Sequence, residues 1–144
     1  MEAYLHEHIP VSAAMGTRVV QATPEGVVLA APLAPNVNHR DTAFGGSVAA
    51  LAILAGWTLV HLRLHEEGIH ARTVIQTTHM RYLVPVEDAF EAHATPPSER
   101  AWHRFLAALE RRRRGRVRLQ VEVRCFGQLV ATLEGAYVAM LEEA

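Results

Sequence analysis

The chain has 144 residues, of which 50% are hydrophobic and 20% charged, a balance that indicates a packed globular domain and excludes intrinsic disorder as the main interpretation. The formal net charge is −1, so the chain as a whole is not expected to bind nucleic acid. Its one cysteine, Cys125, cannot form an internal disulfide and suits a reducing compartment. Residues 1–10 lack the basic start and continuous apolar run of a signal peptide. We therefore expect a single domain over residues 1–144 and a cytoplasmic location.

The N-terminal part of the chain predicts a short helix followed by a β-hairpin. Ala3–His8 can form a helix, which Pro10 is expected to end. Thr17–Ala22 and Val27–Leu33 are rich in strand-forming residues, and the Thr-Pro-Glu-Gly between them has proline and glycine where a turn favours them. We expect these two segments to pair as antiparallel strands.

A polar loop over residues 34–43 then leads into a long apolar helix, Phe44–Glu67. Asp41 or Thr42 can cap its first turn, and Gly68 is placed to stop it. The first turns of this helix are apolar nearly all round, so the rest of the fold must surround them. Its continuous apolar run is shorter than the roughly 20 residues that cross a bilayer. We therefore expect a buried core helix and no membrane insertion.

Four further strands are predicted after the core helix, with a second helix between the second and third of them. The second helix opens at Ser98, runs to about Arg113 and is expected to end at Gly115. Its apolar stripe, Trp102, Phe105 and Leu109, is expected to cover the sheet, with a lid over a ligand channel as the alternative. Gly135 is expected to form a β-bulge in the last strand. The four strand segments are Arg72–Val84, Ala89–Thr95, Val117–Cys125 and Leu129–Met140.

Short turns between neighbouring strands predict a mostly antiparallel sheet of about six strands. The core helix can lose its whole surface to water only if this sheet curls around it. The second helix then precedes the fifth strand. This α+β architecture is the hotdog fold.

The loop and helix start, residues 35–51, contain the pattern Asn-x-Asn…Thr-x-Phe-Gly-Gly-Ser. This pattern resembles that of the YiiD C-terminal type of thioesterase, a hotdog family. Ala31–Leu33, Gly56-Trp57 in the core helix and Tyr82–Pro85 at the end of the third strand are similar to the same family. The resemblance extends over nearly the whole chain.

The resemblance implies hydrolysis of an acyl thioester on coenzyme A or on acyl carrier protein, within fatty acid metabolism. Coenzyme A would enter as part of the substrate, with no separate cofactor and no metal. Hotdog thioesterases place their site between subunits at the start of the central helix, so the resemblance also implies a homodimer or a dimer of dimers.

The sequence departs from one related hotdog group, in which His-Gly-Gly opens the helix and an acid lies two turns later. Here Phe44-Gly45-Gly46 stands at the opening and Ile53 at the later position. Another hotdog group places its acid in the loop before the helix, where this chain has Asp41.

Thioester hydrolysis requires a polarised carbonyl and an activated water, and the helix start has candidates for both. A helix N-terminus offers free N–H groups, and Gly45 and Gly46 would let a carbonyl oxygen approach them, although they can equally serve close packing. Asp41 is the candidate base or nucleophile, with N-capping as its alternative, while turn formation is the alternative for the asparagines. We expect Asp41, Asn38, Gly46 and Ser47 to be catalytic and the substrate to be bound by Asn36, His39, Thr42, Phe44, Gly45, Arg81 and Tyr82.

Three other features carry weaker predictions. His61 and His65 have a spacing found in metal sites but no evident third ligand, so a solvated helix end is expected. The run Arg111–Arg116 is also expected to be a solvated helix end, with an anion site for coenzyme A phosphates or an acidic carrier protein as the alternative. Cys125 is in phase with the apolar positions of its strand and is expected in the core.

Two other functions remain open from the sequence. A hydroxyacyl-thioester dehydratase or hydratase would need an acid–base pair across the substrate, for which His39 and Asp41 are the candidates. A non-catalytic acyl-coenzyme A-binding module is favoured by the absence of an acid near Ile53.

Overall fold

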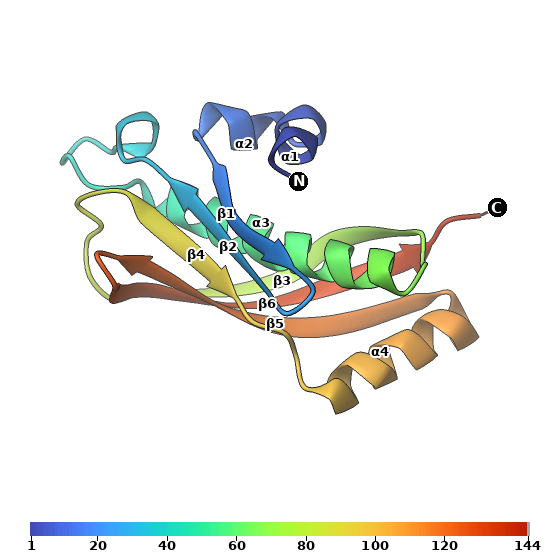
Figure 1. Cartoon of the computed structure of the whole chain (residues 1–144). Helices are drawn as coiled ribbons and strands as arrows, with labels where there is room; N and C mark the ends of the chain where they lie inside the picture. The colour runs from blue at the N-terminus through green and yellow to red at the C-terminus, as the bar shows by residue number, and fades with distance from the viewer. Residues whose placement is uncertain (144) are drawn as a thin grey trace.

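In the computed structural model, which describes residues 1–143, one antiparallel sheet curls around a long helix, α3 (Figure 1). The six strands have the order β1-β2-β4-β5-β6-β3, so β1 and β3 form the two edges. This is the predicted hotdog fold, with α4 preceding the fifth strand. The elements are α1 (Glu2–His8), α2 (Pro10–Ala14), β1 (Arg18–Thr23), β2 (Gly26–Ala31), η1 (Ala34–Asn36), α3 (Gly45–Glu66), β3 (Ala71–Tyr82), β4 (Phe90–Ala94), α4 (Glu99–Arg112), β5 (Arg114–Cys125) and β6 (Gln128–Leu141).

The core lies between α3 and the inner face of the sheet. Alternate residues of β5 from Val117 to Cys125 are buried, and the residues between them are exposed or half-buried. Leu51, Ala52 and Ala55 of α3 are fully buried. By length and composition α3 could cross a membrane, but 56% of its most apolar window is buried within the protein. The prediction of a core helix is therefore confirmed, as is that of a core cysteine.

Both long helices begin or end at predicted residues, with one exception. Gly68 follows α3 with a φ of +72°, and the Ser98 side chain accepts a hydrogen bond from the Ala101 amide at the start of α4. However, α4 ends at Arg113, whose φ is 62°, and the prediction that Gly115 ends it is wrong. Gly115 lies in β5, where a Cβ would be 2.9 Å from both Cδ1 and the carbonyl oxygen of Phe105. That glycine is needed because β5 passes close to α4.

Two further predictions are corrected. Pro10 follows the end of α1 and also begins α2. Proline suits the first position of a helix because an amide N–H there would have no hydrogen-bond partner within the helix. Gly135 does not form a bulge, because it pairs in register with Thr78 on one side and Leu119 on the other. The register between β3 and β6 shifts instead between Ile75 and Thr77.

Helix α4 covers one end of the core, as its apolar stripe predicts. Trp102, Phe105 and Leu109 are all buried in the main hydrophobic cluster. The Arg63 guanidinium lies 4.7 Å from the centre of the Trp102 ring and 3.3 Å from a Glu99 carboxylate oxygen. These contacts join α4 to the later part of α3, which favours the covering role over that of a lid.

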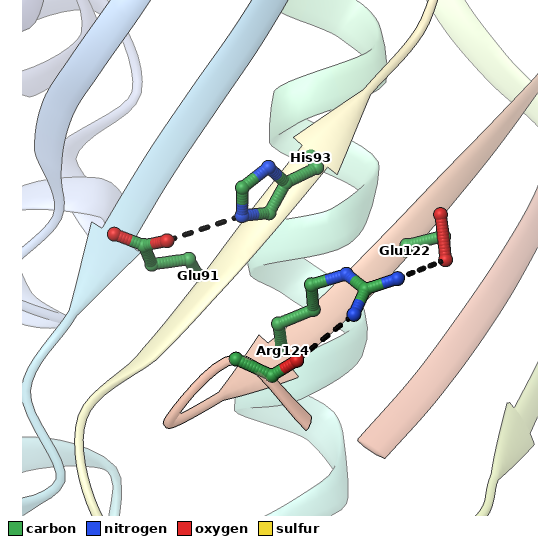
Figure 2. A network of polar contacts seen from close by, with 5 residues as sticks. Glu91, His93, Glu122 and Arg124 are labelled. Carbon is green, nitrogen blue, oxygen red and sulfur yellow. Dashed lines mark hydrogen bonds and ion pairs between the residues drawn. The ribbon is translucent and has the colours of Figure 1, made fainter. Parts of the chain in front are cut away.

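The outer face of the sheet is polar. Figure 2 shows two contacts on β4 and β5: His93 with Glu91 at 3.1 Å, and Arg124 with Glu122 at 2.9 Å. Arg124 also donates to the Gly127 carbonyl at 2.9 Å. Because these side chains are partly exposed, the pairs contribute little to stability and mark a solvated surface.

Candidate functional site

Most of the predicted site residues lie where the loop before α3 meets the end of β3. A cavity of about 350 Å³ lies there, and Thr42, Val48, Tyr82 and Val130 are among its lining residues. The main chain holds the loop in place. The Ala43 amide donates to the Val86 carbonyl at 2.8 Å, and the Phe44 amide donates to the Asn36 carbonyl at 2.7 Å.

No side chain caps the first turn of α3, so the prediction that Asp41 or Thr42 caps it is wrong. The N-cap residue is Phe44, whose carbonyl accepts from the amides of Ser47 and Val48 at 2.9 and 3.1 Å. Within residues 1–143, no hydrogen bond is found from the amides of Gly45 and Gly46. These two N–H groups, at the positive end of a long helix, can donate to an oxygen of a bound molecule.

The two glycines differ in their surroundings. A Cβ at Gly46 would overlap the ring of Phe44, which lies across the first turn and is exposed. A Cβ at Gly45 would lie 3.5 Å from the Tyr82 ring, an ordinary contact distance. Close packing thus accounts for a glycine at position 46 but not at position 45.

Tyr82 connects the edge strand to the helix start. Its hydroxyl donates to the Gly45 carbonyl at 3.0 Å, although the side chain is 55% exposed. Ser47, in the same first turn, is half-buried, and its hydroxyl makes no hydrogen bond within the described chain. The structure therefore brings Phe44, Gly45, Gly46, Ser47 and Tyr82 together, as predicted.

Asn38 organises the loop that carries Asp41. Its Oδ1 accepts from the amides of Arg40 and Thr42 at 2.8 and 3.2 Å, and its Nδ2 donates to the Thr42 hydroxyl at 2.8 Å. This is the turn chemistry expected of asparagine. The side-chain groups of Asn38 and Thr42 are thus engaged with each other, and a direct substrate contact by either stays a prediction.

Asp41 lies at the exposed tip of this loop. Its φ of 63° is left-handed, a conformation that aspartate tolerates better than most residues. Within residues 1–143 its carboxylate makes no hydrogen bond or ion pair. It is therefore an uncommitted carboxylate near the helix start, which suits a base.

Asn36 has a structural position. It is 2% exposed, and its Nδ2 donates to the carbonyls of Met15 and Pro32 at 2.9 and 2.7 Å. These bonds hold the loop to the end of α2 and the end of β2. Its Oδ1 has no partner in the described chain, so a role in substrate binding stays a prediction.

Two predicted residues do not join the group within this chain. Arg81 lies on the outer face of the sheet, where it lines a separate cavity of about 280 Å³ with His79 and Glu122. His39 is exposed, and no contact with Asp41 is found in the described part of the chain.

Sequence reasoning missed Tyr137. From β6 its hydroxyl donates to the Ile53 carbonyl at 2.7 Å, and a Cβ at Gly56 would overlap it. Burial raises the pKa of Tyr137 well above its ordinary value of about 10, so the phenol stays protonated and donates. Two features of the sequence could have indicated this contact. Tyr137 is at a buried position of the last strand, and Gly56 lies inside the core helix.

His65 is exposed at the end of α3, as predicted, but His61 is not. The His61 ring is half-buried and stacks between Tyr4 and Trp57, with centroid distances of 5.2 and 4.9 Å. Burial, and secondarily the charge of His65, lowers the pKa of His61. Among residues 1–143, no group of three or more His, Cys, Asp or Glu side chains is placed to hold a metal ion.

Comparison with known proteins identifies similar chains. A family model described as "Putative thioesterase (yiiD_Cterm)" matches residues 1–141. A putative thioesterase from Shewanella oneidensis is 33% identical with a TM-score of 0.86, over 96% of this chain and 94% of that one. A protein of unknown function from Chlorobaculum tepidum TLS is 27% identical with a TM-score of 0.93, over 98% of this chain and 92% of that one. A probable thioesterase from Pseudomonas aeruginosa, 22% identical over 98% of this chain and 94% of that one, shares the fold with a TM-score of 0.83.

Proposed function

The chain belongs to the yiiD C-terminal family of hotdog-fold thioesterases, and we propose that it hydrolyses acyl thioesters of coenzyme A or acyl carrier protein at the first turn of α3. The observation that carries this proposal is the pair of unbonded amides at Gly45 and Gly46, beside a loop with a free carboxylate. An uncapped helix start is suited to an oxygen that becomes negative during the reaction.

In this mechanism the thioester carbonyl oxygen accepts hydrogen bonds from the Gly45 and Gly46 amides. Asp41 takes a proton from a water molecule, whose oxygen attacks the carbonyl carbon. The carbon–sulfur bond then breaks, and the sulfur takes up the proton that Asp41 accepted and leaves as a thiol, which regenerates the Asp41 carboxylate. The products are a free carboxylic acid and the thiol of the carrier, and no separate cofactor is consumed.

We also propose that the site is completed in a homodimer. The edge strand β3 is 12 residues long, and its outer edge has no partner in the described chain. Long unpaired edges favour pairing with another strand. Pairing of two β3 strands would join the sheets of two copies and bring Arg81 of one near the partner's β3. Two such dimers could associate further into a tetramer. A cytoplasmic location is consistent with the unpaired Cys125.

The test is release of free thiol from acyl-coenzyme A and acyl carrier protein thioesters by the purified protein and by Asp41→Asn. Asparagine retains the size of the side chain and tolerates left-handed backbone, so the loop should persist while the base is lost. We expect kcat to fall by about two orders of magnitude or more, the usual contribution of a general base. Unchanged turnover in Asp41→Asn would exclude Asp41 as the base. Saturable binding with no turnover of any thioester would instead support the acyl-binding module.

A further inference from the structure

A basic cavity lies on the outer face of the sheet, where α4 runs alongside β5 (Figure 1). Its volume is about 310 Å³. Arg112 comes from the end of α4, and Arg114 and Arg116 come from β5. None of the described lining residues is acidic, and the uncharged ones include Gln76, Ala108 and Val138. The cavity is therefore suited to an anion.

The short connection between α4 and β5 brings the three guanidinium groups to one place. Arg112 is the last residue of α4 and Arg114 the first of β5, and only Arg113, with its left-handed φ of 62°, stands between them. The Arg113 guanidinium instead donates to the Glu142 carbonyl at 3.4 Å. Arg116 follows Arg114 on the same face of the strand, about 7 Å further along it.

Arg112, Arg114 and Arg116 have no acidic partner within residues 1–143. All three are exposed, and none of them takes part in the ion pairs or side-chain hydrogen bonds of this part of the chain. Like charges around one hollow repel each other, and bound phosphates would offset that repulsion. Guanidinium groups bind phosphate oxygens two at a time, so the cavity fits a ligand with more than one phosphate.

The catalytic site of the same chain is far from this cavity. In the register of the sheet, Arg114 lies beside Met140, and Met140 lies beside Arg72. Arg72 and Tyr82 are separated by ten positions of β3, which is about 33 Å along the strand. A ligand in the cavity would have to extend over this distance to reach the helix start in its own chain.

The proposed homodimer brings a second site closer. Pairing of two β3 strands about a twofold axis is antiparallel, so over the full length of the strand Arg72 of one copy faces the partner's Arg81. The partner's Tyr82, and with it the helix start, is next to that position. Three strand spacings separate it from Arg114, about 15 Å in all. Arg81, which lies apart from the site of its own chain, then adds positive charge between the cavity and the partner's site.

We propose that this cavity binds the phosphates of coenzyme A and that in the homodimer it serves the catalytic site of the partner. The proposal rests on the proposed thioesterase function and deepens it by selecting coenzyme A as the carrier. Coenzyme A presents a diphosphate and a 3′-phosphate on one small nucleotide. The arm of an acyl carrier protein has a single phosphate, bonded to the protein, which three converging arginines do not require.

The length of coenzyme A agrees with this arrangement. About 13 covalent bonds separate its sulfur from its first phosphorus, an extended length of roughly 16 Å. That length spans the distance from the cavity to the partner's site but not the distance within one chain. Both positions lie at the same end of the joined sheet, so the arm can pass over the strand ends from the outer to the inner face.

The experiment compares one acyl group on three carriers: coenzyme A, pantetheine and acyl carrier protein. Thiol release gives kcat and KM for each with the wild type, Arg114→Gln, Arg116→Gln and the double variant. Arg18→Gln is the matched control, because Arg18 is also exposed but lies on β1, at the opposite edge of the sheet. Binding of coenzyme A is measured in parallel by calorimetry.

Each single replacement should raise KM for the coenzyme A thioester by about tenfold, the scale of one lost charge-assisted hydrogen bond, with little change in kcat. KM for the pantetheine thioester should be the same in all variants, and Arg18→Gln should behave as the wild type. The proposal is overturned if KM for the coenzyme A thioester does not respond. It is also overturned if the pantetheine thioester responds equally, or if only the acyl carrier protein thioester responds.

Hybrid dimers test which site the cavity serves. One copy has Asp41→Asn with intact arginines, and the other has Asp41 with both arginine replacements; Gly45→Ala takes the place of Asp41→Asn if that variant remains active. If the cavity serves the partner, the one active site is complete, so KM should equal that of the wild type and kcat per dimer should be about half. A KM as high as that of the double variant would overturn the assignment to the partner's site.

Failure of the thioesterase function is distinguishable from failure of this proposal. If the protein is not a thioesterase, no thioester is cleaved, yet coenzyme A still binds the wild type and Arg18→Gln and binds the double variant more weakly by about tenfold or more. Equal binding of coenzyme A to all variants would overturn the proposal whether or not thioesters are cleaved.

Discussion

The Tyr82 hydroxyl donates to the Gly45 carbonyl at 3.0 Å, and this contact joins the last residue of the edge strand to the first residue of the core helix. It fixes the start of the helix, where the uncapped Gly45 and Gly46 amides lie, relative to the end of β3. Tyr82 is 55% exposed and contributes little to the core. Replacing it with phenylalanine therefore tests whether its hydroxyl positions the helix start, with little effect on the stability of the fold.

Tyr82→Phe is expected to lower kcat by about fivefold, equivalent to the roughly 1 kcal/mol of one neutral hydrogen bond, with little change in KM. The measurement is steady-state kinetics on an acyl-coenzyme A thioester. Tyr4→Phe is the matched control, because the Tyr4 hydroxyl makes no hydrogen bond in the described chain and lies on α1. Equal rates for the wild type and Tyr82→Phe would exclude a positioning role for this bond.

The two glycines at the helix start should respond differently to alanine. Gly46→Ala must displace the exposed Phe44 ring, which can turn into solvent, so it is expected to lose activity and only a small part of its stability. Gly45→Ala meets only an ordinary contact with Tyr82 and should be as stable as the wild type or up to about 1 kcal/mol more stable, since alanine favours helix.

Despite that stability, Gly45→Ala should lose about tenfold or more in kcat/KM, because the methyl group would occupy space beside the amide that receives the carbonyl oxygen. Thermal unfolding and thiol release, measured on both variants, separate the two effects. A stable and fully active Gly45→Ala would show that the substrate does not approach that amide.

The order of the elements followed from the sequence because each has a strong local pattern. The alternation of apolar and polar residues in β5 can be recognised within a short stretch of sequence, and so can the apolar surface of α3. The end of α4 was misplaced because it depends on a distant contact: Gly115 is needed where β5 passes Phe105, while Arg113 takes the left-handed conformation.

The candidate site was predictable only in part, for the same reason. Phe44–Ser47 and Tyr82 both belong to the segments that resemble the family, and the structure places Tyr82 beside the start of α3. The partner of Asn36 is the carbonyl of Met15, 21 residues away, and Tyr137 reaches a carbonyl 84 residues away. Such pairings are set by how the sheet closes on α3, and no local pattern contains them.

Asp41 holds a conformation that costs stability. A left-handed backbone is unfavourable for residues with a Cβ, and glycine adopts it freely. Asp41→Gly is therefore expected to raise the free energy of unfolding by about 0.5 kcal/mol, after allowance for the greater entropy of the unfolded glycine chain. It should nevertheless abolish most of the hydrolase activity, because the carboxylate is lost.

Phe126→Gly is the matched control for Asp41→Gly. Phe126 also has a left-handed φ, 51°, and is 84% exposed in the turn between β5 and β6. This variant should gain similar stability and keep full activity. Denaturant unfolding and thiol release on both variants provide the comparison. Loss of stability in Asp41→Gly would show that the carboxylate supports the loop.

The stacking of His61 between Tyr4 and Trp57 predicts a dependence of stability on pH. Burial, and then the charge of His65, lowers the pKa of His61 below the ordinary value of 6.5. The unfolded chain therefore binds a proton on His61 more readily than the folded protein does. The contribution of neutral His61 to stability is fully present above about pH 6.5 and is lost as the pH falls through and below that value.

His61→Phe keeps an aromatic ring between Tyr4 and Trp57 and removes the titration. We expect its unfolding temperature to fall less than that of the wild type between pH 7.5 and 5.5, measured by circular dichroism at several pH values. His70→Gln, at an exposed position before β3, should keep the pH dependence of the wild type. Parallel curves for the wild type and His61→Phe would mean that other groups titrate on unfolding.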